Sequence, residues 1–239
     1  MWDENYLLSE LPSEEETKEE ATFIFEVLEL RRGSVLLDLC CGQGRHGIQL
    51  ASSGVNIIGV DSSRFLLKET DSHAMLGVDK IHLVEGDMRN LPLKPVCDVV
   101  INLFTSFGFF DEAGNKKVLS EVASVLKPGG KFLVDYWNPY AVTQLDRSRN
   151  WWWLSESTLA LAEVEYQPKS GQLFDHRTII EIPTKTIRKM VNPVRFYFPT
   201  ELERLLKEVG LHVCATYGDF DYSEFSIEAR RMITVAEKL

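Results

Sequence analysis

A turn with closely spaced glycines carries the clearest chemical signal in this sequence. Gly42 and Gly44 follow the apolar run Val35–Leu39. A second apolar run, Val55–Val60, ends at Asp61, 19 residues after Gly42. Glycines let a backbone turn sharply beside a ligand, and a carboxylate at the end of the second strand commonly binds a ribose diol. The spacing therefore predicts a site for a cofactor that contains a nucleoside.

Two classes of cofactor are compatible with this turn. Gly42, Gly44 and Gly47 satisfy the G-x-G-x-x-G pattern of dinucleotide-binding turns. Such a turn brings backbone amides and a helix N-terminus to a pyrophosphate, beside which a carboxylate is unfavourable. Asp38 lies inside the first strand, near the turn, where it suits a cationic ligand. S-adenosylmethionine (SAM) carries an ammonium and a sulfonium and no phosphate, so Asp38 favours SAM.

The segment from Asp38 to Gly44, D-L-C-C-G-Q-G, resembles the D-x-G-x-G-x-G signature of class I SAM-dependent methyltransferases. It departs from the signature at Cys40, which stands in place of the first glycine and makes the local turn geometry an open question. The resemblance implies an α/β fold with a seven-stranded, doubly wound, Rossmann-like sheet whose final strand is antiparallel. It also implies methyl transfer from SAM, with S-adenosyl-L-homocysteine (SAH) as the product.

The resemblance also implies, by position, which residues contact the cofactor. A G-D-x element after the third strand gives Asp87 and Met88 as the adenine contacts. The end of the fourth strand gives Leu103 and Phe104 beside the methionine part of SAM. Arg45 is a further candidate, for the methionine carboxylate, and a surface salt bridge is the alternative role for it. The predicted cofactor-binding set is Asp38, Cys40, Gly42, Gly44, Arg45, Asp61, Ser62, Asp87, Met88, Leu103 and Phe104.

The sequence says less about a catalytic base. The acceptor atom must lie in line with the S–CH₃ bond, with water excluded. A deprotonated amine needs little more, whereas a hydroxyl or a carboxylic acid can require a base. The two candidates for that base are His176 and Tyr136.

Helices and strands that alternate along the chain must position these residues. Apolar periodicity and turn signals predict helices over Ser13–Leu30, His46–Ser52, Ser63–Leu76, Asn115–Leu126 and Thr200–Val209. They predict strands over Val35–Leu39, Val55–Val60, Ile81–Val84, Val96–Leu103, Lys131–Tyr136, Leu211–Tyr217 and Arg231–Ala236. Capping boxes are expected at Ser13 with Glu16 and at Thr200 with Glu203.

The acidic cluster around the first helix, which includes Glu20, is interpreted as a solvated helix start. An N-terminal aromatic residue often closes over the cofactor in this family, and Trp2 or Tyr6 is placed to do so. Packing the first helix against the core is the alternative role for these two residues.

Residues 137–198 exceed what the core fold needs. Strands are expected over Trp151–Leu154, Thr158–Tyr166, Leu173–Ile182 and Thr186–Phe198. The predicted organisation is therefore a SAM-binding core of residues 1–136 and 199–239 with an inserted antiparallel β subdomain, 137–198, on the substrate side. Trp151 to Trp153 are interpreted as core or dimer contacts, with stacking on a substrate as the alternative, so a homodimer through the insert is possible.

Composition limits the partners. The net charge of −10 over 239 residues argues against a nucleic-acid substrate, because phosphate binding needs a basic face. The four cysteines form no C-x-x-C motif, which argues against a zinc site and a disulfide framework. No apolar run approaches the length of a membrane span, and the acidic N-terminus is unlike a signal peptide. A cytoplasmic protein is expected.

These observations predict an enzyme that methylates a small molecule on an amine, a hydroxyl or a carboxylate. An RNA or protein methyltransferase is the second hypothesis, and its support is the basic group Lys185, Arg188, Lys189 and Arg195. A non-catalytic SAM- or nucleotide-binding regulator is the third.

Overall fold

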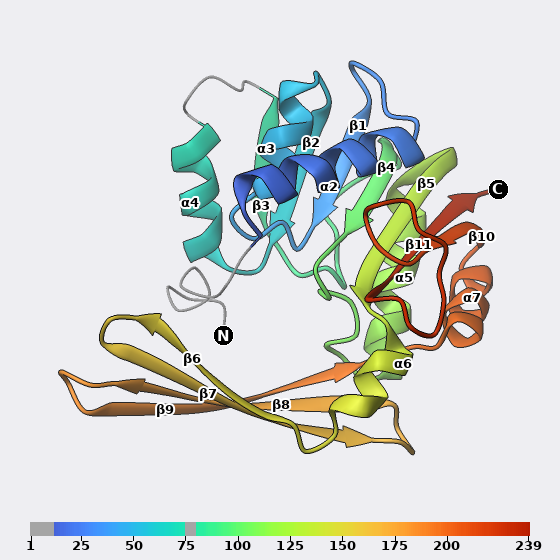
Figure 1. The fold of residues 1–239 in the computed structure, drawn as a ribbon. Helices are drawn as coiled ribbons and strands as arrows, with labels where there is room; N and C mark the ends of the chain where they lie inside the picture. Colours follow the sequence, from blue (N-terminus) through green and yellow to red (C-terminus); the bar gives the residue numbers. More distant parts are fainter. Residues whose placement is uncertain (1–11, 75–79) are drawn as a thin grey trace.

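The computed structural model describes residues 12–74 and 80–239, and it contains two sheets. The larger sheet has seven strands in the order β10-β11-β5-β4-β1-β2-β3 (Figure 1). Its strands are β1 (Val35–Leu39), β2 (Asn56–Asp61), β3 (Ile81–Glu85), β4 (Cys97–Asn102), β5 (Leu126–Trp137), β10 (Leu211–Tyr217) and β11 (Arg231–Lys238). β11 is antiparallel to β5 and to β10, whereas β1 to β5 pair in parallel. The predicted fold class is confirmed. Trp2 and Tyr6 lie outside the described residues.

Helices cover both faces of this sheet. They are α2 (Glu14–Val27), α3 (Arg45–Ser52), α4 (Arg64–Ala74), α5 (Glu112–Val125), the one-turn α6 (Pro139–Val142) with the 3₁₀ turn η1 (Thr143–Leu145), and α7 (Pro199–Glu208). Neighbouring residues of β1 show the two layers. Leu36 packs in a cluster with α2 and α3, and Leu37 packs in a cluster with α5 and α7. Successive side chains of a strand point to opposite faces, so an apolar run is what a strand buried on both sides requires.

The two helix starts for which capping boxes were predicted differ. At α2 the capping box is confirmed, because the Ser13 amide donates to Glu16 Oε2 at 2.7 Å and the Glu16 amide donates to Ser13 Oγ at 3.2 Å. At α7 the prediction is wrong. The helix begins at Pro199, whose fixed φ suits a first helical position, and Glu201 accepts from the Phe198 amide at 2.9 Å in place of Glu203.

A second, four-stranded antiparallel sheet, here called the insert sheet, extends below the core in Figure 1. Its strands are β6 (Arg149–Ser155), β7 (Thr158–Gln167), β8 (Gln172–Glu181) and β9 (Thr186–Arg195). The strand order is β6-β7-β8-β9, as expected for consecutive hairpins. All four strands lie within the predicted insert of residues 137–198, although the fourth ends at Arg195 and the chain then leads into α7.

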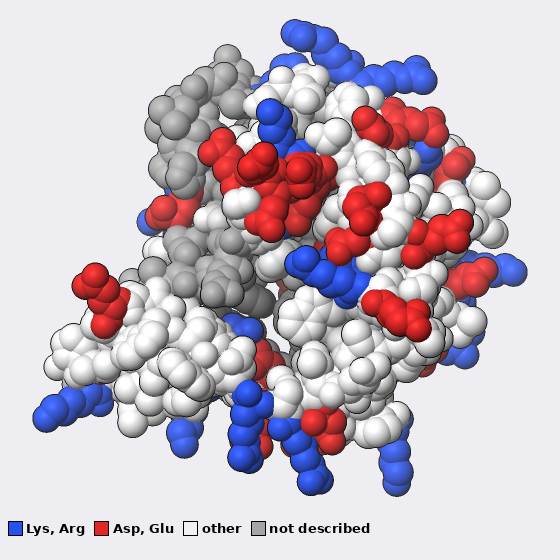
Figure 2. Space-filling view, viewed as in Figure 1, with Lys and Arg blue, Asp and Glu red and all other residues white. Residues whose placement is uncertain are grey.

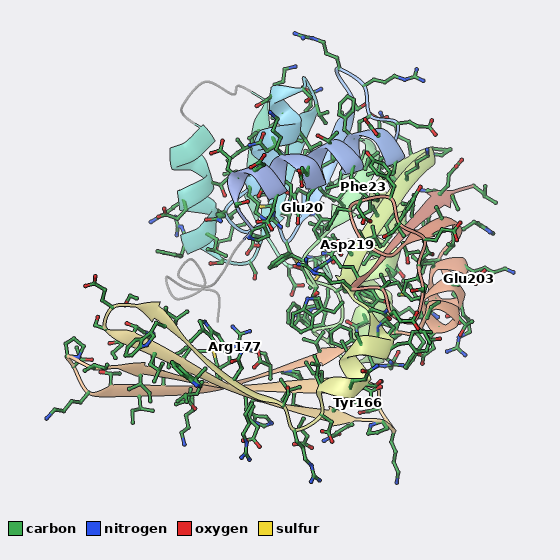
Figure 3. All side chains as sticks on the ribbon, viewed as in Figure 1. Glu20, Phe23, Tyr166, Arg177, Glu203 and Asp219 are labelled. Carbon is green, nitrogen blue, oxygen red and sulfur yellow. The ribbon has the colours of Figure 1, made fainter. Side chains whose placement is uncertain are left out.

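The two faces of the insert sheet differ in character. The inner face carries Leu173 and Val194, which are paired in register and buried in the main core. Figure 3 shows Arg177, four residues after Leu173 and therefore on the same face of β8, on the side of the insert sheet toward the seven-stranded sheet. The outer face carries Trp151 and Trp153, which are 62% and 52% exposed. In the described part of the chain, no helix combines the length and apolar character of a membrane span.

Candidate functional site

The turn after β1 takes the backbone conformation that its glycines predict, and Cys40 joins them. Cys40, Gly42 and Gly44 all have positive φ, at +64°, +56° and +74°. Cys40 therefore adopts a left-handed conformation, although its Cβ makes that conformation costly. Glycine takes this conformation without such strain, so the backbone at Cys40 is of the kind that favours a glycine.

Asp61, at the end of β2, fixes this turn. Its Oδ2 accepts from the Gly42 amide at 2.9 Å, and its Oδ1 accepts from the Ser63 amide at 2.7 Å. Each carboxylate oxygen can accept more than one hydrogen bond, so Asp61 keeps capacity for a ligand hydroxyl. Ser62, the next predicted contact, is exposed beside it.

Gly44 has a packing role that the sequence did not reveal. A Cβ added at Gly44 would overlap the Thr70 side chain of α4, whereas one added at Gly42 would meet nothing closer than Leu66 Cδ1, at 3.9 Å. A side chain at position 44 would therefore disturb the packing of the turn against α4 as well as the approach of a ligand. The close contact at Gly44 is thus with the Thr70 side chain of α4.

A narrow pocket of about 40 Å³ opens at the carboxyl ends of β1 and β4. Its lining includes six of the predicted contacts: Asp38, Cys40, Gly42, Arg45, Leu103 and Phe104. It also includes four residues that the sequence prediction did not contain: Cys41, Gln43, His46 and Ser106. Residues 66 positions apart in the chain meet here because parallel strands end at one edge of the sheet.

The predicted adenine contacts lie beside this pocket and do not line it. Met88 is buried, and its Sδ lies 3.5 Å from the Cys40 Sγ. The half-exposed Asp87 pairs with Arg89, whose Nη2 donates to Asp87 Oδ2 at 2.6 Å. The Met88 contact links the turn after β3 to the turn after β1.

Asp38 is the buried acid of the pocket. Burial raises the pKa of its carboxyl to about 7, although the Arg45 guanidinium lowers it; the Asp61 carboxylate raises it further. A carboxyl in this condition gains from a cationic ligand, because the cation replaces the lost hydration of the charged form.

Arg45 and His46 are tied to helix α2 through Glu20. The His46 Nε2 lies 2.8 Å from Glu20 Oε2, and Arg45 Nη1 donates to the same oxygen and to Thr17 Oγ1, at 3.0 Å for the latter. Burial raises the pKa of Glu20, but His46 and Arg45 lower it more, so it stays below its usual value. The interpretation of Glu20 as part of a solvated helix start is wrong, since its side chain is only 13% exposed (Figure 3).

The geometry does not favour either predicted base. Tyr136 is 2% exposed and its hydroxyl donates to the Tyr197 carbonyl at 2.8 Å, while burial raises its pKa well above the usual value. His176 pairs in register with Glu163 and Val191 on the outer face of the insert sheet, 3.8 Å from Glu165 Oε2. Tyr136 is held as a core residue, and His176 lies on the face turned away from the pocket.

Comparison with known proteins identifies the class. Residues 36–130 match the family described as "Methyltransferase domain". A glycine/sarcosine N-methyltransferase of Halorhodospira halochloris is 25% identical over 234 residues, covering 92% of this chain and 81% of the relative. A demethylmenaquinone methyltransferase of Clavibacter sepedonicus is 32% identical over 102 residues, covering 43% of this chain and 40% of the relative.

A solved structure of an S-adenosylmethionine-dependent methyltransferase from Clostridium acetobutylicum has the same fold. It aligns with a TM-score of 0.81 at 20% identity, covering 93% of this chain and 92% of that one. The chain is a class I, Rossmann-like SAM-dependent methyltransferase. It is therefore an enzyme, and its cofactor is SAM.

Proposed function

We propose that this enzyme transfers the methyl group of SAM to an amine nitrogen of a small molecule. The proposal rests on the share of this chain that each relative matches. The N-methyltransferase relative matches 92% of the chain, which includes the insert sheet, whereas the demethylmenaquinone methyltransferase matches 43%. Substrate specificity commonly resides in segments added to a shared scaffold, so the relative that also matches the insert is the better guide.

The charges of Asp38 and Arg45 in the pocket, and of Asp61 at the end of β2, support SAM as the ligand. We assign the Asp38 carboxylate to the ammonium, the Arg45 guanidinium to the methionine carboxylate and the Asp61 carboxylate to the ribose diol. The remaining predicted contacts are proposed to line the adenine and sulfonium ends. When bound, SAM supplies an activated methyl group, and the chain's task is to hold an acceptor in line with it and to exclude water.

The inner face of the insert sheet supports an acceptor that carries N–H or O–H donors. Asp175 and Asn192 pair in register there, and the Oδ1 atom of each is buried without a hydrogen-bond partner among the described residues. Arg177 Nε donates to the other Asp175 oxygen, Oδ2, at 2.6 Å, which fixes the orientation of that carboxylate. Unpaired buried acceptors are costly, and a ligand ammonium or hydroxyl would satisfy them.

An amine acceptor also agrees with the titratable groups of the pocket. His46 is bonded to Glu20, and burial lowers the His46 pKa. A neutral amine attacks through its own lone pair, so it needs no strong base from the protein. A hydroxyl acceptor can require a base to remove its proton, and the described pocket residues are less suited to that reaction.

The surface charge does not support the RNA hypothesis. Figure 2 shows acidic side chains gathered over α2, while Lys and Arg side chains lie along the lower edge of the insert. Within the predicted basic group, Arg188 Nη2 donates to Glu181 at 2.6 Å, and Arg195 pairs with Glu201 at 2.6 Å and Glu112 at 2.9 Å. Lys189 lies on the outer face, opposite Arg188. These residues do not form one open basic surface.

The outer face of the insert sheet is proposed to pair with a second copy of the chain. Trp151 and Trp153 are joined there by Leu161, 37% exposed, and Ile187, 60% exposed. Monomers seldom leave such a group of large apolar side chains in water. Trp152 points to the inner face, 5.7 Å from the Arg177 guanidinium, so the three tryptophans have different roles.

The function is tested by binding and then by turnover. Titration calorimetry should show that SAM and SAH bind and that NAD does not. Turnover with methyl-labelled SAM is then compared for glycine, sarcosine and glucosamine, with glucose as the matched control that replaces the amine by a hydroxyl. Label on nitrogen alone supports the proposal. Label on oxygen, or equal labelling of glucose and glucosamine, contradicts it.

A further inference from the structure

Phe104 and Thr105 are consecutive residues with left-handed backbones, at φ +57° and +62°. This conformation is rare for residues that carry a Cβ, and for a β-branched residue such as Thr105 it is a genuine outlier. Strained backbone persists only where the surroundings hold it, and it gathers at functional sites. Phe104 lines the cofactor pocket, so the strain lies in the pocket wall.

Asp135 of β5 holds both strained residues. The Phe104 amide donates to Asp135 Oδ2 at 2.8 Å, and the Thr105 amide donates to the Asp135 carbonyl at 3.0 Å. The Trp137 amide donates to Thr105 Oγ1 at 3.3 Å. Phe104 and Thr105 thus form three hydrogen bonds with residues 135–137 of β5, and these bonds fix the conformation of the turn.

Arg231 of β11 holds Asp135 in turn. Its Nε donates to Asp135 Oδ1 and its Nη2 donates to Oδ2 at 2.8 Å, in the two-pronged geometry typical of Arg with a carboxylate. Both residues are buried, Arg231 at 3% and Asp135 at 0% exposure. The Arg231 guanidinium also lies 5.6 Å from the centre of the Phe104 ring, so it contacts the wall directly.

A buried ion pair is a poor way to gain stability, because desolvating two charges can cost more than their attraction returns. The Asp135–Arg231 pair instead supplies what the strained turn needs, a fixed charged acceptor for the Phe104 amide. The far end of the same loop is held by the insert sheet. The Arg195 amide donates to the Gly108 carbonyl at 2.8 Å, and a Cβ at Gly108 would overlap the Arg195 carbonyl.

We propose that Asp135 and Arg231 are positioning residues for methyl transfer, which fix the Phe104–Thr105 turn as the wall at the sulfonium end of the cofactor pocket. The proposal deepens the proposed function and rests on its placement of Phe104. A wall set in this way distinguishes SAM from SAH, because the two ligands differ only by the methyl group and the charge on sulfur. It has little effect on adenosine, which lacks that end.

The test uses the double variant D135N/R231Q, which removes both buried charges together and leaves neither unpaired. Titration calorimetry measures the dissociation constants of SAM, SAH and adenosine. We expect the SAM-to-SAH ratio to change by at least about fivefold, with less than about a twofold change for adenosine, in keeping with the sensitivity of reacting groups to small misplacements. Two controls are Ile233→Val, a buried change on the same strand, and K116Q/E208Q, which removes an exposed ion pair of 2.6 Å.

Thr105→Gly separates positioning from folding. Glycine adopts positive φ freely, so the melting temperature should be equal to or above that of the wild type, while the ratio still changes. An unchanged ratio in both D135N/R231Q and Thr105→Gly overturns the proposal, as does an equal change in Ile233→Val. Failure to methylate any amine would contradict the proposed acceptor only, since the ratio is measured without one.

Discussion

The Gly42 amide donates to Asp61 Oδ2 at 2.9 Å and joins the turn after β1 to the end of β2. The carboxylate that we assign to the ribose of SAM is thus also a structural acceptor for the turn that approaches the cofactor. Cofactor affinity and turn geometry are coupled through one side chain. A change at Asp61 should therefore affect both binding and stability.

Asp61→Ala should weaken SAM binding by at least about tenfold and lower the free energy of unfolding by about 1–3 kcal/mol, because two backbone amides lose their acceptor. Calorimetry and chemical denaturation measure the two effects. Asp98→Ala is the matched control. Asp98 also accepts from a backbone amide, that of Val35 at 2.8 Å, but it lies at the opposite end of the strands. Equal loss of SAM affinity in both variants would show that Asp61 acts only through folding.

The affinity for SAM should depend on pH through Asp38. Its pKa of about 7 in the free protein means that the carboxyl is largely protonated below pH 7 and must lose its proton to pair with the SAM ammonium. Affinity should therefore rise between about pH 6 and pH 8, and Asp38→Asn should flatten the profile. Titrations at a series of pH values measure this. A wild-type profile that is flat over this range contradicts the assignment.

The stability of the free enzyme should follow the opposite trend. The folded-state pKa of Asp38 is raised from 3.8 to about 7, so folding retains a proton that the unfolded chain releases. The contribution of this group to the free energy of unfolding is fully present below about pH 4 and is lost as the pH rises to about 7. Thermal melts of the wild type and Asp38→Asn without ligand should converge at low pH and separate above it.

Arg45→Ala should weaken binding of SAM and of SAH by about tenfold or more, because both carry the methionine carboxylate that we assign to Arg45. Adenosine lacks that group and should bind as it does to the wild type. Calorimetry with the three ligands checks the assignment. If adenosine binding falls as much as SAM binding, Arg45 acts on the shape of the turn through Glu20 and Thr17.

Cys40 and Cys41 should respond oppositely to glycine. Cys40 has φ +64°, and Cys41 is not among the residues with positive φ. Cys40→Gly should leave the free energy of unfolding within about 0.5 kcal/mol of the wild type or raise it, since relief of strain offsets the entropy that glycine costs. Cys41→Gly should lower it by about 1–2 kcal/mol. Denaturant titration distinguishes them, and equal losses would contradict the strain at Cys40.

W151E/W153E should convert a dimer to a monomer, because two charged side chains would replace the apolar contact on the outer face of the insert sheet. Light scattering after size-exclusion chromatography measures the mass. Ile227→Glu is the control, since Ile227 is equally exposed, at 60%, but lies outside the insert sheet. A monomeric wild type, or a dimer that survives the double substitution, contradicts the proposed interface.

Local patterns in the sequence were sufficient to predict the architecture. The apolar run from Val35 to Leu39 required burial on both faces, and only a parallel strand between two helix layers provides that burial. The D-x-x-x-G-x-G segment predicted the cofactor class because Asp38 suits a cation. The insert strands were found from turn residues at Pro168–Gly171 and Pro183–Lys185, which interrupt β-branched and aromatic runs.

The missed features depend on contacts between distant segments. Glu20 lies in an acidic helix start and resembles its solvated neighbours in the sequence. It is, however, four residues before the buried Ile24, and this spacing puts Glu20 on the buried side of α2. Arg231 opens β11 directly before the buried residues Met232 and Ile233, and this position was the local signal that Arg231 is buried. Its partner Asp135 is 96 residues away, and nothing in either segment specifies the other.

The sequence by itself determined the fold, the cofactor and the approximate place of the pocket, since these follow from periodicity and from residues close together in the chain. The tertiary structure alone decided that the Thr70 side chain packs where a Cβ of residue 44 would lie, and that His176 faces away from the pocket. It also decided that Asp135 and Arg231 contact Phe104. The physical reason is that hydrogen bonds and ion pairs form between atoms that folding brings together, so their partners are set by how the elements pack.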